Sequence, residues 1–412
     1  MIQHRLNIRL RRHILFAAGF AGAGALAVAC SSNSNMAGGT AGTGGSAGST
    51  GTPSGGTSAG KGGAGNSGAS AGGTNNGGTT ANPGAGAGGA PEITNFSVKR
   101  TDLDSDQAGT GRTDANLLNA WGIAINPGAE LFWVASNHGG LVTVYDATGA
   151  IKPLAPQVPP LTGTDPGAPT GQIFNAGTGF MADKFVVDTE DGQILGWGGS
   201  GDFVQRAKKD GAIYKGLALV GTGAAQLLVA TDFHDGTVDL YGTDYKPVTK
   251  DGAFIDTSIP AGFAPFNAMP IGDKVYITYA KQDSAKEDDE PGPGNGYVSE
   301  FATDGTFTKT LISGGELDSP WAVALAPSNF GALAGTLLVG NFGGGAIHAY
   351  DAASGALVGQ LTEQRGNPLI ILGLWDLKVG PTGTPDLSNT LFFSAGPGAE
   401  SHGIFGKLEA GN

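Results

Sequence analysis

The chain has 412 residues and a formal net charge of −13, because 36 aspartates and glutamates outnumber 23 lysines and arginines. Such an acidic surface repels phosphate groups, so we expect no nucleic-acid partner. The single cysteine, Cys30, excludes an intramolecular disulfide, and the fold must therefore depend on its own apolar core.

The first 29 residues have the pattern of a secretory signal peptide. Residues 1–13 contain four arginines and no acid, and residues 14–29 are apolar or small. This apolar stretch is shorter than the ~20 residues that a membrane-spanning helix needs. We predict that residues 1–29 direct export and are then removed. The pair Arg11-Arg12 leaves both the general and the twin-arginine export routes open.

The cysteine follows this segment directly, in the sequence Ala27-Val28-Ala29-Cys30. These residues resemble the bacterial lipobox, which implies cleavage before Cys30 and attachment of a lipid to its thiol. The lipobox usually has Leu three residues before the cysteine, and this chain has Ala27 there. The alternative is that Cys30 is only a small apolar residue of an ordinary signal peptide. We predict lipidation, which would anchor the protein in the cell envelope, in the outer membrane, through the lipid alone.

Residues 30–91 follow as a segment of Gly, Ala, Ser, Thr and Asn that shows no apolar period. Such a composition cannot bury enough apolar surface to offset the conformational entropy lost on folding. We therefore predict a flexible linker between the lipidated cysteine and a folded domain.

Residues 92–412 read as short β segments separated by Gly, Asp, Asn and Pro, which predicts an all-β domain. One hairpin recurs, with its clearest copies at Leu141–Asp146, Tyr297–Phe301 and Ala346–Asp351. The third strands of six such units are expected to begin at residues 141, 193, 237, 297, 346 and 403. Four antiparallel strands in each unit, at a period of about 50 residues, are typical of β-propeller blades. We therefore predict one six-bladed β-propeller.

The sixth unit ends after its third strand, so another part of the chain must supply the outer strand. The alternating segment Ile93–Arg100 is the expected source, and it would close the ring between the two ends of the domain. The next segment, Asp102–Asp106, imitates the start of a calcium-binding loop but lacks the glycine and the glutamate that such loops require. We expect a solvated loop there.

Several short motifs resemble those of a family of exported bacterial six-bladed propellers, whose arrangement is similar to TolB-like and NHL-type propellers. The motifs include Asn116–Ala124, Pro260–Asn267, Thr278–Asp283 and Leu338–Gly343. The resemblance covers residues 100–409, and it implies the fold and export but no reaction. Around the tryptophans of the first strands, Ala322, Leu372 and Asp376 depart from the family pattern.

A candidate binding site follows from the repeat, because loops that enter the innermost strands and turns that follow the second strands share one face of a propeller. The residues expected around the channel on this face are Asn119, Trp121, Asn137, His138, Glu190, Lys215, His234, Asn267, Lys281, Trp321, Asn341, Trp375 and Asp376. These polar and aromatic side chains predict a binding funnel. The alternative is that the tryptophans only pack between blades and that the Asp-Gly pairs in these turns only satisfy turn geometry.

The sequence requires no cofactor, but oxygen ligands from Asn119, Asn267 and Asp376 could hold Ca²⁺ at the channel mouth. The acidic insert Asp283–Glu290 overhangs the same face. We expect it to be solvated, and a lid or a metal loop is the alternative.

The sequence offers no set of residues with the spacing of a catalytic triad. We therefore predict a monomeric, non-catalytic propeller that binds a protein or glycan partner at the cell surface. The alternative is a calcium-dependent hydrolase or lyase of the lactonase type, with its site at the channel mouth. A channel filled by Trp and Phe would argue against this alternative.

Overall fold

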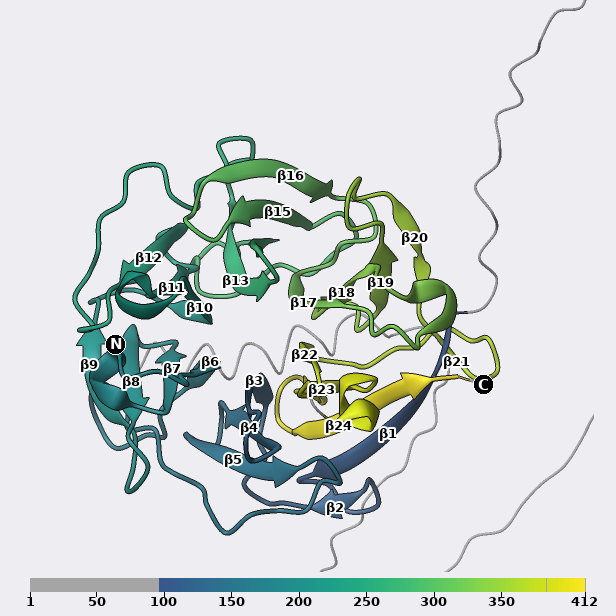
Figure 1. The fold of residues 1–412 in the computed structure, drawn as a ribbon, viewed down its shortest axis with the longest axis horizontal. Helices are drawn as coiled ribbons and strands as arrows, with labels where there is room; N and C mark the ends of the chain where they lie inside the picture. The colour runs from purple at the N-terminus through teal and green to yellow at the C-terminus, as the bar shows by residue number, and fades with distance from the viewer. Residues whose placement is uncertain (1–95, 383, 412) are drawn as a thin grey trace, which may run out of the picture. The chain divides into compact units, whose positions relative to one another are not determined.

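The computed structural model describes residues 96–382 and 384–411, which form a ring of six β-sheets (Figure 1). The sheets are six blades built on a four-stranded antiparallel plan, so the predicted β-propeller is confirmed. The first strand of each blade lies nearest the central axis, and the later strands follow outward. The predicted signal segment, Cys30 and the linker lie outside the described residues.

The first three blades take up the chain from residue 120 to residue 241. Blade 1 contains β3 (Ala120–Asn126), β4 (Leu131–Ser136) and β5 (Leu141–Asp146). Blade 2 contains β6 (Pro169–Phe174), β7 (Phe185–Thr189), β8 (Gln193–Trp197) and β9 (Val204–Lys208). Blade 3 contains β10 (Tyr214–Val220), β11 (Leu227–Asp232) and β12 (Thr237–Tyr241).

The other three blades continue in the same order. Blade 4 contains β13 (Phe263–Ile271), β14 (Lys274–Lys281), β15 (Gly296–Ala302) and β16 (Phe307–Ser313). Blade 5 contains β17 (Pro320–Leu325), β18 (Leu337–Asn341), β19 (Ile347–Tyr350) and β20 (Leu357–Gln360). Blade 6 contains β22 (Leu374–Val379), β23 (Leu391–Ala395), β24 (Ile404–Ala410) and, as its outer strand, β1 (Ser97–Ser105).

A few short elements decorate this ring. Two-residue strands β2 (Arg112–Thr113) and β21 (Thr362–Glu363) pair with β1. The short helices η2 (Phe180–Ala182), η3 (Gly223–Ala225), η4 (Gly331–Leu333) and α2 (Pro385–Ser388) lie between the first and second strands of their blades. None of the helices in the described part of the chain is long and apolar enough to cross a membrane.

The ring closes where β1 pairs antiparallel with β24, from Val98 opposite Ala410 to Ser105 opposite Ile404 (Figure 1). The outer strand of blade 6 therefore comes from the N-terminal end of the domain, as expected, although it runs to Ser105 rather than ending at Arg100. The prediction of a solvated loop at 102–106 is wrong. β1 instead continues to pair with β24 through these residues, with an irregularity in register between Asp102 and Asp104. Asp104 is fully buried there.

The core is divided among the blades rather than gathered at one centre. Six clusters of buried apolar side chains each join two neighbouring blades, including the pair formed by blades 6 and 1. A twisted sheet buries its faces only when another layer covers them. Each blade therefore depends on both neighbours, which makes the closed ring the stable unit.

Candidate functional site

The central channel is filled by aromatic side chains, which we call the plug: Trp121, Phe233, Phe266, Trp321, Phe342 and Trp375. The rings of Trp121 and Trp375 stack with centroids 3.5 Å apart, and Phe342 stacks on Trp375 at 3.9 Å. Trp321 meets Trp375 edge to face. The three tryptophans enter from β3, β17 and β22, so the repeat places them together at the axis, as the sequence predicts.

Side chains of one blade bind the main chain of the next blade around the plug. Asn267 donates from Nδ2 to the carbonyl oxygen of Trp321, at 2.9 Å. Asp376 accepts a hydrogen bond from the Ile123 N–H, at 2.8 Å, and another from the Leu377 N–H at the same distance. Burial raises the pKa of Asp376. These contacts give Asn267 and Asp376 a role in joining blades.

A second layer of polar side chains lies against the plug, and we call it the mouth network. Its members are Asn119, Asn137, Glu190, Lys215, Asp288 and Glu400. Asn119 donates to Glu400, at 2.8 Å, and to Asn137, at 3.4 Å. Asn137 donates to Glu190, at 3.2 Å. The network therefore runs continuously between loops of blades 6, 1 and 2.

Lys215 completes the network at its other end. Its ammonium nitrogen lies 2.6 Å from Glu190 Oε1 and 3.1 Å from Asp288 Oδ1. It also lies 5.4 Å from the centroid of the Trp121 ring, within the range of a cation–π contact. A buried charge is stable only when partners replace its water, and these three groups supply that replacement.

Two hydrogen bonds connect the mouth network to the plug. The Trp375 Nε1–H donates to Asn119 Oδ1, at 3.0 Å, and the Trp321 Nε1–H donates to the Lys215 carbonyl oxygen, at 2.9 Å. Asn119 has a positive φ of 50°, which Asn tolerates better than most residues. The aromatic and polar layers are therefore joined directly to each other.

The remaining predicted residues lie outside the mouth network. Asn341 binds within its own blade, accepting from the Asp318 N–H at 2.9 Å and contacting His348 at 3.1 Å. Lys281 forms an ion pair with Glu290, at 3.1 Å. His138 and His234 are partly exposed beside the turns that follow β4 and β11.

The sequence-based list of site residues lacks two members of the network, Asp288 and Glu400. Asp288 belongs to the acidic insert, which packs back onto the ring through Lys215 rather than extending into solvent. Glu400 lies between β23 and β24, the same kind of loop that supplies Asn137 and Glu190. Applying the repeat to the last blade would have identified it.

The proposed calcium site gains no support from this arrangement. Asn119 belongs to the mouth network, whereas Asn267 and Asp376 bind main-chain groups of neighbouring blades. Across residues 96–382 and 384–411, no group of three or more His, Cys, Asp or Glu side chains could hold a metal ion. Calcium binding therefore stays a prediction.

Comparison with known proteins gives relatives in sequence and in fold. No family model matches the chain. "Uncharacterized protein R648" of Acanthamoeba polyphaga mimivirus is 32% identical over 318 residues, which cover 72% of this chain and 76% of the relative. "Uncharacterized protein L690" of the same virus is 31% identical over 319 residues, covering 72% of this chain and 81% of the relative. These relatives are viral, so they give no support to the bacterial source that the sequence motifs imply.

Two solved structures share the fold at low sequence identity. An α-L-arabinofuranosidase from Fusarium graminearum has a TM-score of 0.51 and 11% identity, covering 77% of this chain and 98% of that one. The soluble aldose sugar dehydrogenase from Escherichia coli has a TM-score of 0.50 and 12% identity, covering 76% and 99%. At such identities the similarity supports the fold alone.

Proposed function

We propose that this chain, which belongs to the family of the mimivirus proteins R648 and L690, is a non-catalytic propeller that binds a protein or glycan partner at its channel mouth. One observation carries the proposal. Aromatic side chains fill the channel, and the polar side chains above them bind one another in a fixed network. A rigid layer of this kind suits recognition, because little ordering entropy is lost on binding.

The composition of the mouth favours a polar partner. Glu190, Asp288 and Glu400 bring three carboxylates to the network against the single ammonium group of Lys215. Phe342 is half-buried and stacks on Trp375, so one of its faces can receive an apolar surface. Carboxylates beside an aromatic face are suited to the hydroxyl groups and C–H face of a sugar, or to a polar protein loop.

A hydrolase or lyase of the lactonase type is less compatible with this geometry. Metal-assisted hydrolysis needs oxygen ligands that converge on a cation with an open coordination position. Here the side-chain oxygens of Asp376 accept main-chain hydrogen bonds, and the plug occupies the space beneath the mouth. We therefore favour binding over catalysis.

We further propose that the protein acts outside the cell, held to the envelope by a lipid on Cys30. The support comes from the sequence: a basic and apolar leader, the cysteine directly after it, and a Gly-rich segment before the propeller. The mouth would then be presented at a distance from the membrane surface.

An array of cell-surface glycans tests the binding proposal with the full-length protein. Phe342→Ala removes the aromatic face at the mouth, and we expect it to weaken binding to any retained glycan by about tenfold. Phe307→Ala is the matched control, because Phe307 is 41% exposed on β16 and lies outside the plug. Equal binding by both variants would place the glycan site elsewhere.

The competing enzyme is tested on the same preparation with a simple lactone, with and without added Ca²⁺. We expect no calcium-dependent hydrolysis above the background rate. Hydrolysis that requires Ca²⁺ and disappears in Asp376→Asn would replace the binding proposal with the enzymatic one.

A further inference from the structure

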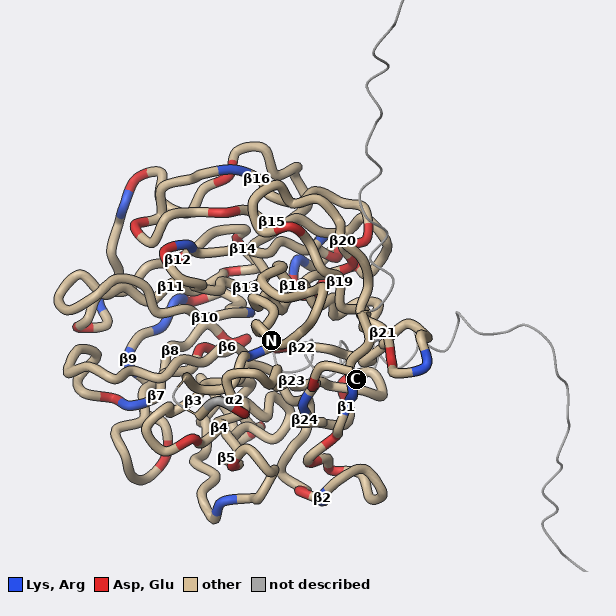
Figure 2. The backbone as a smooth tube through the Cα atoms, turned by 45° about the vertical axis from the view of Figure 1, so that its right-hand side comes forward, with Lys and Arg blue, Asp and Glu red and all other residues tan. Residues whose placement is uncertain are grey.

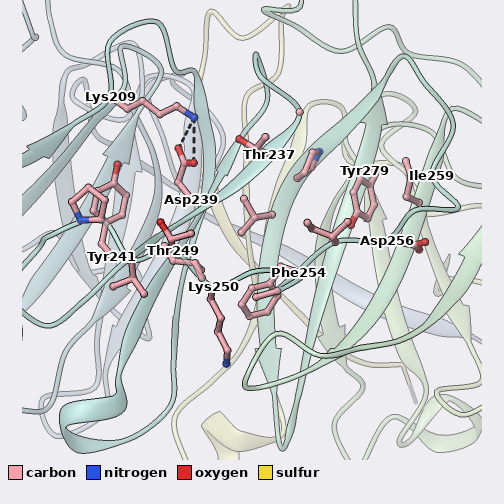
Figure 3. A pocket seen from close by; sticks show the side chains of 18 of the residues that line it. Lys209, Thr237, Asp239, Tyr241, Thr249, Lys250, Phe254, Asp256, Ile259 and Tyr279 are labelled. Carbon is pink, nitrogen blue, oxygen red and sulfur yellow. Dashed lines mark hydrogen bonds and ion pairs between the residues drawn. The ribbon is translucent and has the colours of Figure 1, made fainter.

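A groove of about 770 Å³ lies between blades 3 and 4, and no member of the mouth network lines it (Figure 3). Its size falls within the range of roughly 300–1,000 Å³ that is usual for ligand sites. One wall is β12, and the other is formed by the loop before β13 together with Phe263, Pro265 and Tyr279. The groove is therefore a separate candidate site.

The groove runs along the edge of β12 rather than across one of its faces. All six consecutive residues from Gly236 to Tyr241 line it. Because successive side chains of a strand point to opposite faces, a groove that meets every residue must follow the strand's edge. The main chain of β12 is therefore part of the groove's surface.

This edge is open because blade 3 lacks a fourth strand. Its sheet contains only β10, β11 and β12. The segment after β12 pairs with it through the bridge between Tyr241 and Pro247 and through the hydrogen bond from the Val248 N–H to the Leu240 carbonyl oxygen, at 2.8 Å. Beyond that point, no described strand or bridge pairs with the outer edge of β12 at Val238.

Blade 1 shows what the missing pairing looks like when the chain supplies it. Its sheet also has three strands, but bridges from Tyr145 to Ile151 and from Leu141 to Gln157 cover both ends of β5. The outer edge of β5 is therefore covered along its length by its own chain. Only half of β12 has this cover.

The direction of the open main-chain groups follows from the existing hydrogen bonds. The Leu240 carbonyl points away from β11, because it accepts from Val248. Main-chain groups two residues apart in a strand point to the same side. The N–H and carbonyl of Val238 therefore point into the groove.

Large apolar side chains lie beside the polar and charged ones that line this groove. Ile255 is 55% exposed and Val248 is 37% exposed, which is high for large aliphatic residues. The ring of Tyr279, only 4% exposed, also lines the groove. The groove thus offers apolar contact surface beside the strand edge.

The groove also carries the positive charge of Lys250, which interacts with the Asp304 carboxyl outside the groove and pairs with no carboxylate of the lining. Lys209 is paired with Asp239, at 2.9 Å, and Asp256 accepts hydrogen bonds from Ser258 and other donors. Lys250 is exposed, and its ammonium group donates to a main-chain carbonyl, that of Asp304. On a chain whose acidic residues are spread widely over the ring (Figure 2), this lysine favours an acidic ligand.

We propose that an extended peptide with an acidic side chain binds in this groove as the fourth strand of blade 3. The peptide donates to the Val238 carbonyl and accepts from the Val238 N–H, and its carboxylate meets Lys250. Alternate side chains of the peptide lie against Val248 and Ile255. Addition of a strand to an open sheet edge is a known mode of peptide recognition.

The first test measures binding of a labelled peptide of alternating Val and Thr with one Glu, by fluorescence anisotropy on the full-length protein. Val238→Pro removes the N–H that points into the groove, and we expect it to raise Kd by about tenfold or more. Proline is tolerated on a strand edge whose N–H faces outward, so the β11 pairing should survive. Val238→Thr keeps the N–H and should change Kd by less than about threefold.

A second pair of variants tests the charge without touching the main chain. Lys250→Glu should weaken binding of the Glu-containing peptide by about tenfold and should favour binding of the same peptide with Lys in place of Glu. Lys246→Glu is the control, because Lys246 is exposed, lies in the preceding turn and does not line the groove. We expect it to leave both affinities unchanged.

Four results would overturn the proposal. One is the absence of peptide binding up to millimolar concentration, and another is equal binding by wild type and Val238→Pro. The third is self-association of the full chain that Val238→Pro abolishes, which would make a second copy the occupant. A rise in peptide affinity after deletion of residues 31–90 would instead assign the groove to that segment, and so would also contradict an external partner.

Discussion

The carboxyl group of Asp104 offers the sharpest test of the packing at the ring closure. Asp104 lies in β1, is fully buried, and neither of its carboxyl oxygens has a hydrogen-bond partner among the described residues. Burial raises its pKa from 3.8 to about 7, with Arg112 opposing the shift in part. The perturbation is Asp104→Asn, which replaces the carboxyl with a neutral group of the same shape.

The expected magnitude follows from linkage between protonation and folding. Between about pH 4 and pH 7 the folded protein keeps the proton on Asp104 while the unfolded chain has lost it, so the free energy of unfolding falls as the pH rises through this window. A pKa difference of about three units, at 1.36 kcal/mol for each unit, corresponds to about 4 kcal/mol of the free energy of unfolding, and this amount is lost in full above pH 7. Asp104→Asn should match the wild type near pH 4 and be more stable by up to about 4 kcal/mol near pH 8.

Urea unfolding followed by tryptophan fluorescence at several pH values measures this difference. Asp102→Asn is the control, because Asp102 lies on the same strand, is half-buried and pairs with Arg100 at 2.7 Å. Carboxylates that do not interact with Asp104 titrate equally in both proteins and cancel in the comparison, whereas Asp114 and Asp146 are coupled to it electrostatically. A difference between Asp104→Asn and wild type that stays constant from pH 4 to pH 8 would refute the reasoning.

Three further predictions concern the plug, the lipid and Asp106, the residue that follows β1. Trp375→Ala removes a buried ring that stacks on Trp121, and should lower the free energy of unfolding by about 3–5 kcal/mol in chemical denaturation. Cys30→Ala should release the protein from envelope membranes into the soluble fraction, and a variant that still sediments with membranes would contradict lipidation. Burial acts to raise the pKa of Asp106, but hydrogen bonds from Gly403 and His402 lower it overall. The contribution of Asp106 to the free energy of unfolding is therefore present above about pH 4 and is lost as the pH falls through the lowered pKa. Melting temperatures of Asp106→Asn and wild type should therefore converge in acid.

The sequence predicts the fold well because the signals for a blade are local. The expected third strands at residues 141, 193 and 237 coincide with the starts of β5, β8 and β12. Alternation of apolar residues and turn residues marks such strands within a few residues of chain. The burial of Asp104 was not predictable in this way, because it depends on pairing with β24 at the opposite end of the domain.

The site was only partly predictable, for a different reason. The repeat brings Asn119, Asn137, Glu190 and Lys215 to one face, and the structure joins them in one network. It also places Asn267 near the axis, where its amide binds the neighbouring blade. A repeat predicts the face on which a residue lies, but not whether main-chain groups already occupy its polar atoms. No sequence pattern marks the open edge of β12, because the edge is open only where the loop after the strand turns away from it.

The pairing of β1 with β24 has a consequence for the order in which the protein can mature. The chain emerges with its N-terminal end first, whether from the ribosome or from an export channel. β1 therefore cannot pair with β24 until some 300 further residues have emerged. Until Ile404–Ala410 has emerged, blade 6 lacks its third strand, and the open edge of β1 can pair with a strand of another chain. β1 therefore stays without its partner strand until Ile404–Ala410 is delivered, and chaperone protection is needed throughout that interval.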